Sequence, residues 1–436
     1  MEAIEILKGT RYYDTKEQIL REKIIEIIKK TLERYGFNPI ETPILQFYSL
    51  LASKYAGGEE ILQECYKLKD RGNRNLGLRY ELTITLIPFL LENQNIKLPF
   101  KRYEIGKIFR DGPIKKARIR EFTQFDFDII GCKSKLSELE ILAIYNEVFE
   151  KLGIDIYIYL NNRKILLGIL EYANIKENKN SIILTIDKLE KISEGDIRKE
   201  LVDKGLSEKQ IDKIFEIINL KGNNEEILNE LEKLETKDSR EGTTELKEIL
   251  ELAKIYGLKN IILKPPLARG LNYYTSTIYE IFSNKLNSSL GAGGRYDNLF
   301  KSFLGKELSA IGGSFGIDAI ASILRSEKKS KVQVYLVPVG ITEEKFFPIL
   351  KKLRREFNVD FDLVGRGISK NLEFANRNGI PFCIIVGKDE LRKSKVRLKD
   401  MKSGEEKILS LEEAIKKINL SRQLTNRKLL TYLNLS

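Results

Sequence analysis

Two neighbouring segments between residues 98 and 131 have the alternation of long β-strands. In the second, TQFDFDI at residues 123–129, polar and apolar residues alternate, which places Gln124, Asp126 and Asp128 on one face of a strand. Acidic and amide side chains on a buried face need partners or a ligand. A sheet with one face open to water would give the same pattern, so both interpretations stand.

The preceding strand alternates in the same way and ends in basic residues. One of its faces carries Gly106, which leaves room for the close approach of a ligand or of another backbone segment. The strand ends at Arg110, beside a loop of sequence GPIKKAR. Arginine side chains match the geometry of phosphate groups, which favours a nucleotide site here. A basic surface hairpin is the alternative, and it explains the two lysines of the loop better than it explains Arg110.

Changes in composition predict an α+β protein with an inserted and an appended domain. The insertion alternates charged or amide residues with Leu and Ile, which predicts helices. Strands and glycines then return, and beyond the segment SEKKSK apolar strands alternate with helices. The predicted parts are a core of residues 1–163 and 256–326, a helical insertion of residues 164–255, an α/β domain of residues 331–420 and a tail of residues 421–436.

An amphipathic helix is predicted near the N-terminus, at residues 15–35. Leu20, Ile24, Ile28 and other apolar residues recur there at helical spacing. Thr15 and Gln18 predict a capping box at its start, and Gly36 follows its end.

Composition restricts the chemistry of the chain. Its 436 residues include no histidine, which excludes an imidazole base and a His-ligated metal. A formal net charge of +12 favours a polyanionic partner such as nucleic acid, although charge serving solubility gives the same number. The three cysteines are scattered, and neither a signal peptide nor a membrane-spanning run is expected. We therefore expect a cytoplasmic protein without a structural zinc site.

Three further segments carry residues suited to ligand binding. LGLRYELT places Arg79, Glu81 and Thr83 at alternating positions, where they could hold an ammonium group; an exposed Glu–Arg ladder would look the same. In PPLARGLNYYTSTIYE, Arg269 lies between apolar flanks and a tyrosine pair, which indicates either a ligand contact or a structural salt bridge. The glycine-dense segments GAGGRYDNLF and SAIGGSFGID allow close approach of a ligand or tight strand packing.

Taken in order, these segments resemble the histidine–tRNA ligase family across nearly the whole chain. KGTRYYD resembles its N-terminal signature, and the predicted N-terminal helix together with ETP at residues 41–43 resembles motif 1. FRDGP with REFTQFDFDIIG resembles motif 2, and IGGSFGID resembles motif 3. LARGLNYYTSTIYE and GGRYDNL resemble its two histidine-specific motifs. The resemblance implies the class II synthetase core, an antiparallel sheet flanked by helices with a helical insertion, followed by an α/β anticodon-binding domain.

The resemblance also implies a reaction and a role for each matching residue. Family members are homodimers that activate L-histidine with ATP and Mg²⁺ and transfer it to tRNA(His). Arg269 and Arg110 would be the catalytic residues, and no residue is implied as a metal ligand. The implied ATP-binding residues are Arg110, Arg120, Arg269 and Gly316, and the implied histidine-binding residues are Glu81, Thr83, Gln124, Asp128, Tyr273, Tyr274 and Tyr296.

The chain departs from the family pattern at a few positions. Ala319 stands where motif 3 carries an arginine that contacts ATP, and Asn272 replaces the usual Asp before the tyrosine pair. The alternative function is that of a catalytically silent paralogue, such as the regulatory subunit of ATP phosphoribosyltransferase. Such paralogues lack the histidine-motif arginine and the anticodon domain, whereas this chain keeps Arg269 and the predicted C-terminal domain.

Overall fold

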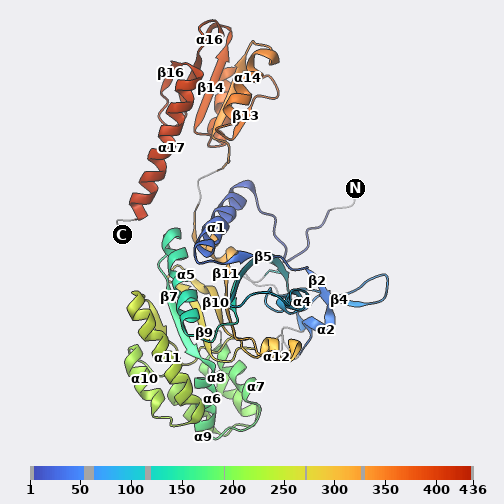
Figure 1. Ribbon diagram of the computed structural model, residues 1–436, viewed down its shortest axis with the longest axis vertical. Coiled ribbons are helices and arrows are strands. Elements are labelled where there is room, and N and C mark those ends of the chain that lie inside the picture. The colour runs from blue at the N-terminus through green and yellow to red at the C-terminus, as the bar shows by residue number, and fades with distance from the viewer. Residues whose placement is uncertain are drawn as a thin grey trace. The chain divides into compact units, whose positions relative to one another are not determined.

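The structure, a computed structural model, describes residues 4–53, 63–112, 119–190, 192–270, 273–325 and 329–433. Asn272 and residues 113–118 of the basic loop therefore lie outside the described residues. The chain forms two compact units (Figure 1). One unit comprises Met1–Tyr12 and Ile24–Ile323, and the other comprises Tyr13–Lys23 and Leu324–Ser436.

An eight-stranded sheet forms the centre of the first unit. Its inner neighbours are all antiparallel, and only the two outermost pairs, β1 with β5 and β7 with β8, are parallel. The antiparallel sheet expected for the core is therefore confirmed, with parallel edges. The strands in order are β1 (Asn38–Pro39), β5 (Phe100–Phe109), β6 (Glu121–Ile130), β11 (Ala310–Gly316), β10 (Leu286–Arg295), β9 (Thr277–Ser283), β7 (Tyr157–Asn162) and β8 (Ile261–Leu263).

The two predicted long strands are β5 and β6, and both faces of the sheet are covered where they pair. On the apolar face, the ring of Phe127 lies 5.4 Å from that of Tyr145 on α5 (Leu136–Leu152). On the other face, Asp126 and Asp128 are only 3% and 2% exposed. The interpretation of that face as open to water is therefore wrong, because other segments cover it.

Shorter elements complete the first unit around this sheet. A separate three-stranded sheet has the order β2-β4-β3. The N-terminal helix predicted at residues 15–35 is present and spans Thr15–Arg34. The predicted capping box is wrong by one residue: the backbone N–H of Glu17 donates to Asp14 Oδ1 at 2.8 Å, and that of Asp14 to Glu17 Oε2 at 3.4 Å. The helix α1 (Thr15–Arg34) belongs to the second unit up to Lys23 and to the first unit from Ile24. The other elements are β2 (Leu45–Phe47), α2 (Tyr48–Leu51), β3 (Lys67–Lys69), β4 (Asn75–Leu78), α4 (Leu86–Glu92), α12 (Leu299–Leu304) and α13 (Ile317–Ile323).

Helices fill the stretch between β7 and β8, where the helical insertion is predicted (Figure 1). Side chains cap the N-termini of most of these helices; Ser207 and Gln210, for example, form a capping box at the start of α9. Gly168 of α6 meets Ser239 of α11 so closely that a side chain there would clash, which lets these helices pack tightly. The elements are α6 (Arg163–Tyr172), α7 (Lys179–Ile186), the short 3₁₀ helix η1 (Asp187–Glu190), α8 (Glu194–Asp203), α9 (Glu208–Ile218), α10 (Asn224–Glu232) and α11 (Lys237–Tyr256).

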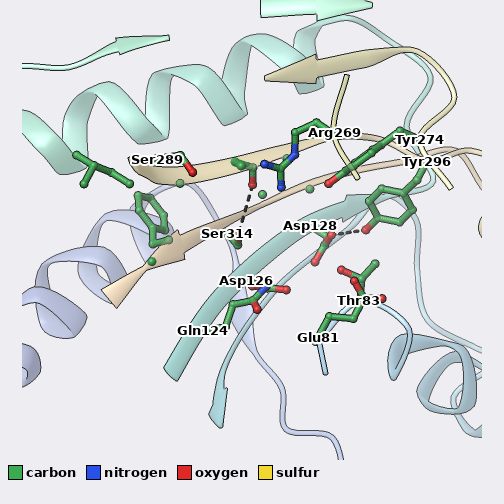
Figure 2. Close-up of a pocket in the computed structure, with 18 of the residues that line it drawn as sticks. Glu81, Thr83, Gln124, Asp126, Asp128, Arg269, Tyr274, Ser289, Tyr296 and Ser314 are labelled. Atoms are coloured by element: carbon green, nitrogen blue, oxygen red, sulfur yellow. Dashed lines mark hydrogen bonds between the residues drawn. The ribbon is translucent and has the colours of Figure 1, made fainter. Parts of the chain in front are cut away.

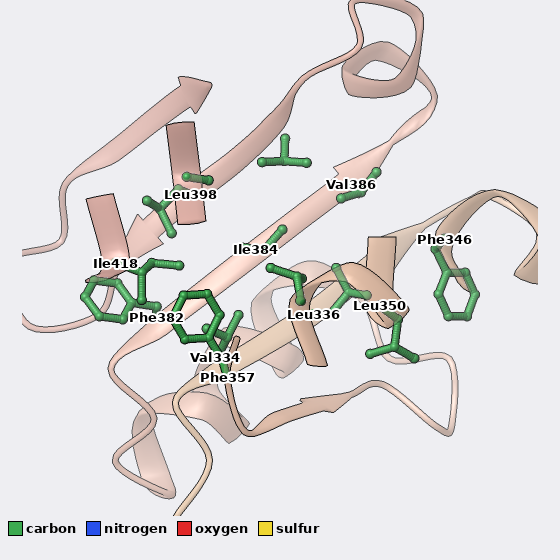
Figure 3. Close-up of a cluster of buried hydrophobic side chains, with 13 residues drawn as sticks. Val334, Leu336, Phe346, Leu350, Phe357, Phe382, Ile384, Val386, Leu398 and Ile418 are labelled. Carbon is green, nitrogen blue, oxygen red and sulfur yellow. The ribbon is translucent and has the colours of Figure 1, made fainter. Parts of the chain in front are cut away.

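The second unit contains a separate five-stranded sheet in the order β13-β12-β14-β15-β16. β12 is parallel to both of its neighbours, and β15 and β16 continue the sheet antiparallel. One face packs Leu336 and Ile384 against Leu350 (Figure 3), and the other buries Val337 and Cys383. The elements are β12 (Val334–Val339), α14 (Glu343–Arg354), β13 (Val359–Phe361), α15 (Ile368–Arg377), β14 (Phe382–Gly387), α16 (Lys388–Arg392), β15 (Val396–Asp400), β16 (Glu406–Leu409) and α17 (Leu411–Leu433).

This second unit has the strand–helix alternation expected of the C-terminal α/β domain. Its last helix, α17, runs beyond residue 420 and ends at Leu433. None of the helices among the described residues is both long enough and apolar enough to cross a membrane.

Candidate active site

A cavity of about 260 Å³ lies on the polar face of the large sheet. Segments that are far apart in the sequence form its walls (Figure 2). The loop before α4 supplies Glu81 and Thr83, β6 supplies four polar residues, and the segment before β9 supplies Arg269. Glycines of β10 and β11 form much of the remaining wall.

Small residues keep this face of the sheet open. In the strand register Gly312 of β11 lies opposite Asp128 of β6, and Ser314 lies opposite Asp126. A methyl group at Gly312 would overlap the carboxylate of Asp128. The glycine-dense segments therefore serve both interpretations of the sequence, because the strands pack closely and also leave space for a ligand.

Glu81 is a buried acid at one side of the cavity. The hydroxyl of Tyr273 donates to Glu81 Oε2 at 3.0 Å, while Oε1 has no hydrogen-bond partner among the described residues. Burial raises the pKa of Glu81 to about 7, against the opposing effects of the Tyr273 hydrogen bond and the charge of Arg110. The cavity thus presents an unsatisfied carboxyl oxygen suited to an N–H donor or a cation.

Asp128 is held from two sides. The buried guanidinium of Arg102 forms an ion pair with it, and the hydroxyl of Tyr296 donates a hydrogen bond to it (Figure 2). Burial raises the pKa of Asp128, and the charge of Arg102 opposes that rise. Arg102 also lies 3.8 Å from Glu104, so its guanidinium is shared between two buried acids.

Asp126 also lines the cavity, on the same face of β6. Its Oδ1 has no hydrogen-bond partner among the described residues, and burial raises its pKa well above the usual value. The sequence alternation placed Asp126 beside Gln124 and Asp128, but the family resemblance assigned it no role. The structure therefore adds one buried acid to the predicted set.

Two arginines give the cavity positive charge. Arg110 Nε donates to the backbone oxygen of Tyr80 at 3.2 Å, and its guanidinium lies 5.3 Å from the centre of the Phe122 ring. Arg269 forms an ion pair with Glu280 of β9, and its Nε has no hydrogen-bond partner among the described residues. Arg269 therefore forms a structural salt bridge, as one of the two interpretations predicted, and it also lines the cavity.

Almost all of the predicted site residues meet at this cavity. Its wall includes Glu81, Thr83, Arg110, Gln124, Asp128, Arg269, Tyr273, Tyr274, Tyr296 and Gly316. Arg120 is not among the lining residues: its side chain lies 3.3 Å from Asp111, and its backbone N–H donates to the backbone oxygen of Gly9. An ATP-binding role for Arg120 stays a prediction.

Arg79 and Gly106 contact each other, which the sequence did not predict. Arg79 does not line the cavity with Glu81 and Thr83; it forms a buried ion pair with Glu104 at 2.7 Å. The space above Gly106 is filled by the guanidinium of Arg79, so this glycine serves a side chain of the protein. No local signal in the sequence marks such pairing, because the partners come from different segments.

The cavity can bind a small molecule with both kinds of charge. Three buried acids suit an ammonium group and ring N–H donors, and two arginines suit carboxylate or phosphate oxygens. The sheet that carries it, the helices between β7 and β8 and the separate α/β unit form the architecture of a class II aminoacyl-tRNA synthetase. This confirms the expected fold.

Comparison with known proteins identifies the family. Residues 9–320 match the family model described as Histidyl-tRNA synthetase, and residues 333–420 match the model described as Anticodon binding domain. Histidine--tRNA ligase 1 of Bacillus cereus is 42% identical over 410 residues, which cover 92% of this chain and 94% of the relative. The chain belongs to the histidyl-tRNA synthetase family.

Solved structures agree with this assignment. The crystal structure of histidyl-tRNA synthetase from Nostoc sp. superposes with a TM-score of 0.84 at 29% identity, covering 97% of this chain and 100% of the other. A structure described as an ATP phosphoribosyltransferase regulatory subunit/histidyl-tRNA synthetase, from Bacillus halodurans, gives 0.75 at 18% identity, covering 89% and 99%. At that identity the second match shows the shared fold alone.

Proposed function

We propose that this protein is a histidine–tRNA ligase, which activates L-histidine with ATP and transfers it to the 3′ end of tRNA(His). One observation carries the proposal: Arg110 and Arg269, 159 positions apart in the sequence, line one cavity together with Glu81 and Asp128. That combination suits an amino acid beside a phosphate ester.

The acids and phenols of the cavity would select histidine. Glu81 and Thr83 would take the α-ammonium group, and Gln124 would also contact the substrate. Asp128 and Tyr296 would hydrogen-bond the ring nitrogens of the imidazole, with Tyr274 beside them. An amino acid without a ring N–H group would offer no donor to Asp128, so it would form fewer hydrogen bonds in the cavity and bind more weakly.

The first step joins histidine to AMP. A carboxylate oxygen of histidine attacks the α-phosphorus of ATP, and the bond to the pyrophosphate oxygen breaks. Negative charge on the phosphoryl oxygens is stabilised in this step by Arg110 and Arg269, whose positions are fixed before the reaction. Gly316, at the end of β11, gives the nucleotide room to approach the backbone.

The second step transfers histidine to tRNA. The hydroxyl of the terminal ribose attacks the carbonyl carbon of the adenylate, and AMP leaves. Both steps depend on positioning and on fixed cations, so no covalent enzyme nucleophile is needed. This suits a chain that contains no histidine.

Mg²⁺ would accompany ATP rather than occupy a prebuilt protein site. Among the described residues no group of three or more acidic or cysteine side chains is arranged to hold a metal ion. Mg²⁺ in nucleotide sites is commonly held by substrate phosphates and one or two carboxylates. The residues of the cavity fit that arrangement, with Asp126 offering one carboxyl oxygen that has no partner among the described residues. When bound, the ion would neutralise phosphate charge.

The partners follow from the family and its second domain. The match of residues 333–420 to an anticodon-binding domain supports tRNA as the partner of the C-terminal unit. A homodimer and a cytoplasmic location are part of the proposal and rest on the family resemblance.

The test is histidine-dependent exchange of pyrophosphate into ATP. We expect exchange with the wild-type protein and a loss of about 10²–10³-fold in kcat for Arg269→Ala. Arg71→Ala, which removes an exposed arginine from the same unit, is the matched control. Absence of exchange, together with histidine-dependent control of a phosphoribosyltransferase, would instead identify the silent paralogue. Binding of tRNA without any exchange would indicate an RNA-binding module.

A further inference from the structure

The helical insertion contributes one direct contact to Arg269. Asp187 begins the short helix η1, which follows α7 within the insertion. Its Oδ1 accepts a hydrogen bond of 2.7 Å from the backbone N–H of Arg269. The two residues are 82 positions apart, so this contact joins the insertion to the segment that carries the cavity arginine.

Arg269 needs such a contact because its backbone is strained. Its φ angle is +68°, in the left-handed region that residues other than glycine rarely adopt. A residue persists there only when surrounding interactions hold it. At Arg269 the carboxylate of Asp187 holds the backbone N–H, and Glu280 of β9 holds the guanidinium. The direction of the side chain into the cavity depends on both anchors.

An arginine of the insertion also interacts with the charge of Asp187. The buried guanidinium of Arg163, at the start of α6, interacts electrostatically with Asp187 and donates to Asn180 Oδ1 of α7 at 3.0 Å. The negative charge of Asp187 therefore acts on two buried arginines, Arg163 and Arg269.

We propose that Asp187 is a positioning residue for Arg269, through which the helical insertion sets the geometry of the adenylation step. Asp187 does not line the cavity, so it acts through the backbone of Arg269 and not on the substrate. A small displacement of η1 would lengthen the 2.7 Å hydrogen bond and release the strained backbone. The proposal rests on the proposed ligase function for its kinetic consequence, but its structural consequence can be measured without any activity.

The kinetic test compares two substitutions that differ in hydrogen bonding. Asp187→Ala removes the acceptor, whereas Asp187→Asn keeps an amide oxygen in its place. We expect Asp187→Ala to lower kcat of pyrophosphate exchange about tenfold or more, with little change in KM for histidine. Asp187→Asn should retain most of the wild-type kcat. Asp203→Ala, which removes an exposed acid from the same insertion, is the matched control.

A second readout separates positioning from general stability. Amide hydrogen exchange, followed by mass spectrometry on peptides that contain Arg269, should speed up in Asp187→Ala and stay near the wild-type rate in Asp187→Asn. Equal kcat values and equal exchange in all variants would overturn the proposal while leaving an active wild-type ligase intact. A wild-type protein without activity would refute the ligase function, and the amide exchange would still decide the role of Asp187. A fall in melting temperature with kcat unchanged would assign Asp187 a purely structural role.

Discussion

Glu81 is a buried acid of the cavity whose pKa lies near neutral pH. Burial raises that pKa from 4.5 to about 7, and the hydroxyl of Tyr273 and the charge of Arg110 limit the rise. Compared with an exposed glutamate, the ligand-free cavity therefore favours the protonated form of Glu81 by about 3 kcal/mol. An ammonium group beside Glu81 favours the carboxylate instead, so substrate binding should drive a proton off this residue.

Proton release on histidine binding should therefore depend strongly on pH. In the free protein about nine in ten Glu81 side chains carry a proton at pH 6, and about one in ten at pH 8. Calorimetric titrations in buffers of different ionisation enthalpy measure the number of protons released. The substrate imidazole also titrates in this range, but its contribution cancels when the wild type is compared with Glu81→Gln. The protein itself adds no imidazole, since it contains no histidine.

The same substitution should weaken binding and strengthen folding. Glu81→Gln cannot become charged, so we expect its histidine affinity to fall about tenfold or more at pH 8 and less at pH 6. Because its folded-state pKa is raised, the wild type binds an extra proton when folded and loses up to about 3 kcal/mol of stability as the pH rises from about 4.5 to 7. Urea unfolding should show Glu81→Gln to be the more stable protein at pH 8.

Glu92→Gln is the control, because Glu92 is exposed at the end of α4. It should change neither proton release nor the pH dependence of stability. Equal proton release by the wild type and Glu81→Gln at pH 6 would refute the reasoning. So would a stability difference between them that stays constant from pH 5 to pH 8.

Three further predictions concern the cavity wall, the nucleotide and the fold. Gly312→Ala should raise KM for histidine about tenfold, because the added methyl displaces Asp128, and an unchanged KM in exchange kinetics would contradict this. Ala319→Arg should lower KM for ATP severalfold, up to about tenfold, by restoring the family's motif 3 cation; unchanged ATP kinetics would show that no cation is missing. Arg295→Ala should cost about 3 kcal/mol in urea unfolding, since it removes hydrogen bonds of 2.7 and 2.6 Å from the buried carboxylate of Glu138. Glu138 would keep only Lys135, at 3.5 Å, as a charged partner among the described residues. A much smaller loss would mean that Lys135 and Thr277 compensate the charge of Glu138.

The order of the motifs made the family and much of the site predictable. Alternation in TQFDFDI predicted which side chains share a face of β6, because successive side chains of a strand point to opposite sides. The family resemblance then gathered Arg110 and Arg269 into one site. It assigned nothing to Asp126, although the alternation had already placed that acid beside two predicted ligands.

Local patterns were less reliable where two interpretations compete within a few residues. The capping box of α1 uses Asp14 and Glu17, one position before the predicted pair, because either pair has the spacing of the motif. Gly106 was predicted to allow the close approach of a ligand or of backbone. The group that approaches it is the side chain of Arg79, and glycine spacing carries no information about which group that is.

The sequence by itself determined the strands, the helices, the family and the kinds of chemistry open to a chain without histidine. Those properties depend on local periodicity, on motif order and on composition. Only the tertiary structure decided that the polar face of β6 is buried, that Arg102 pairs with Asp128, and that Asp187 holds the backbone of Arg269. Each of these depends on segments that the folded chain brings together from distant positions. Burial then sets both the charge and the pairing of a side chain, because an unpaired charge away from water is costly.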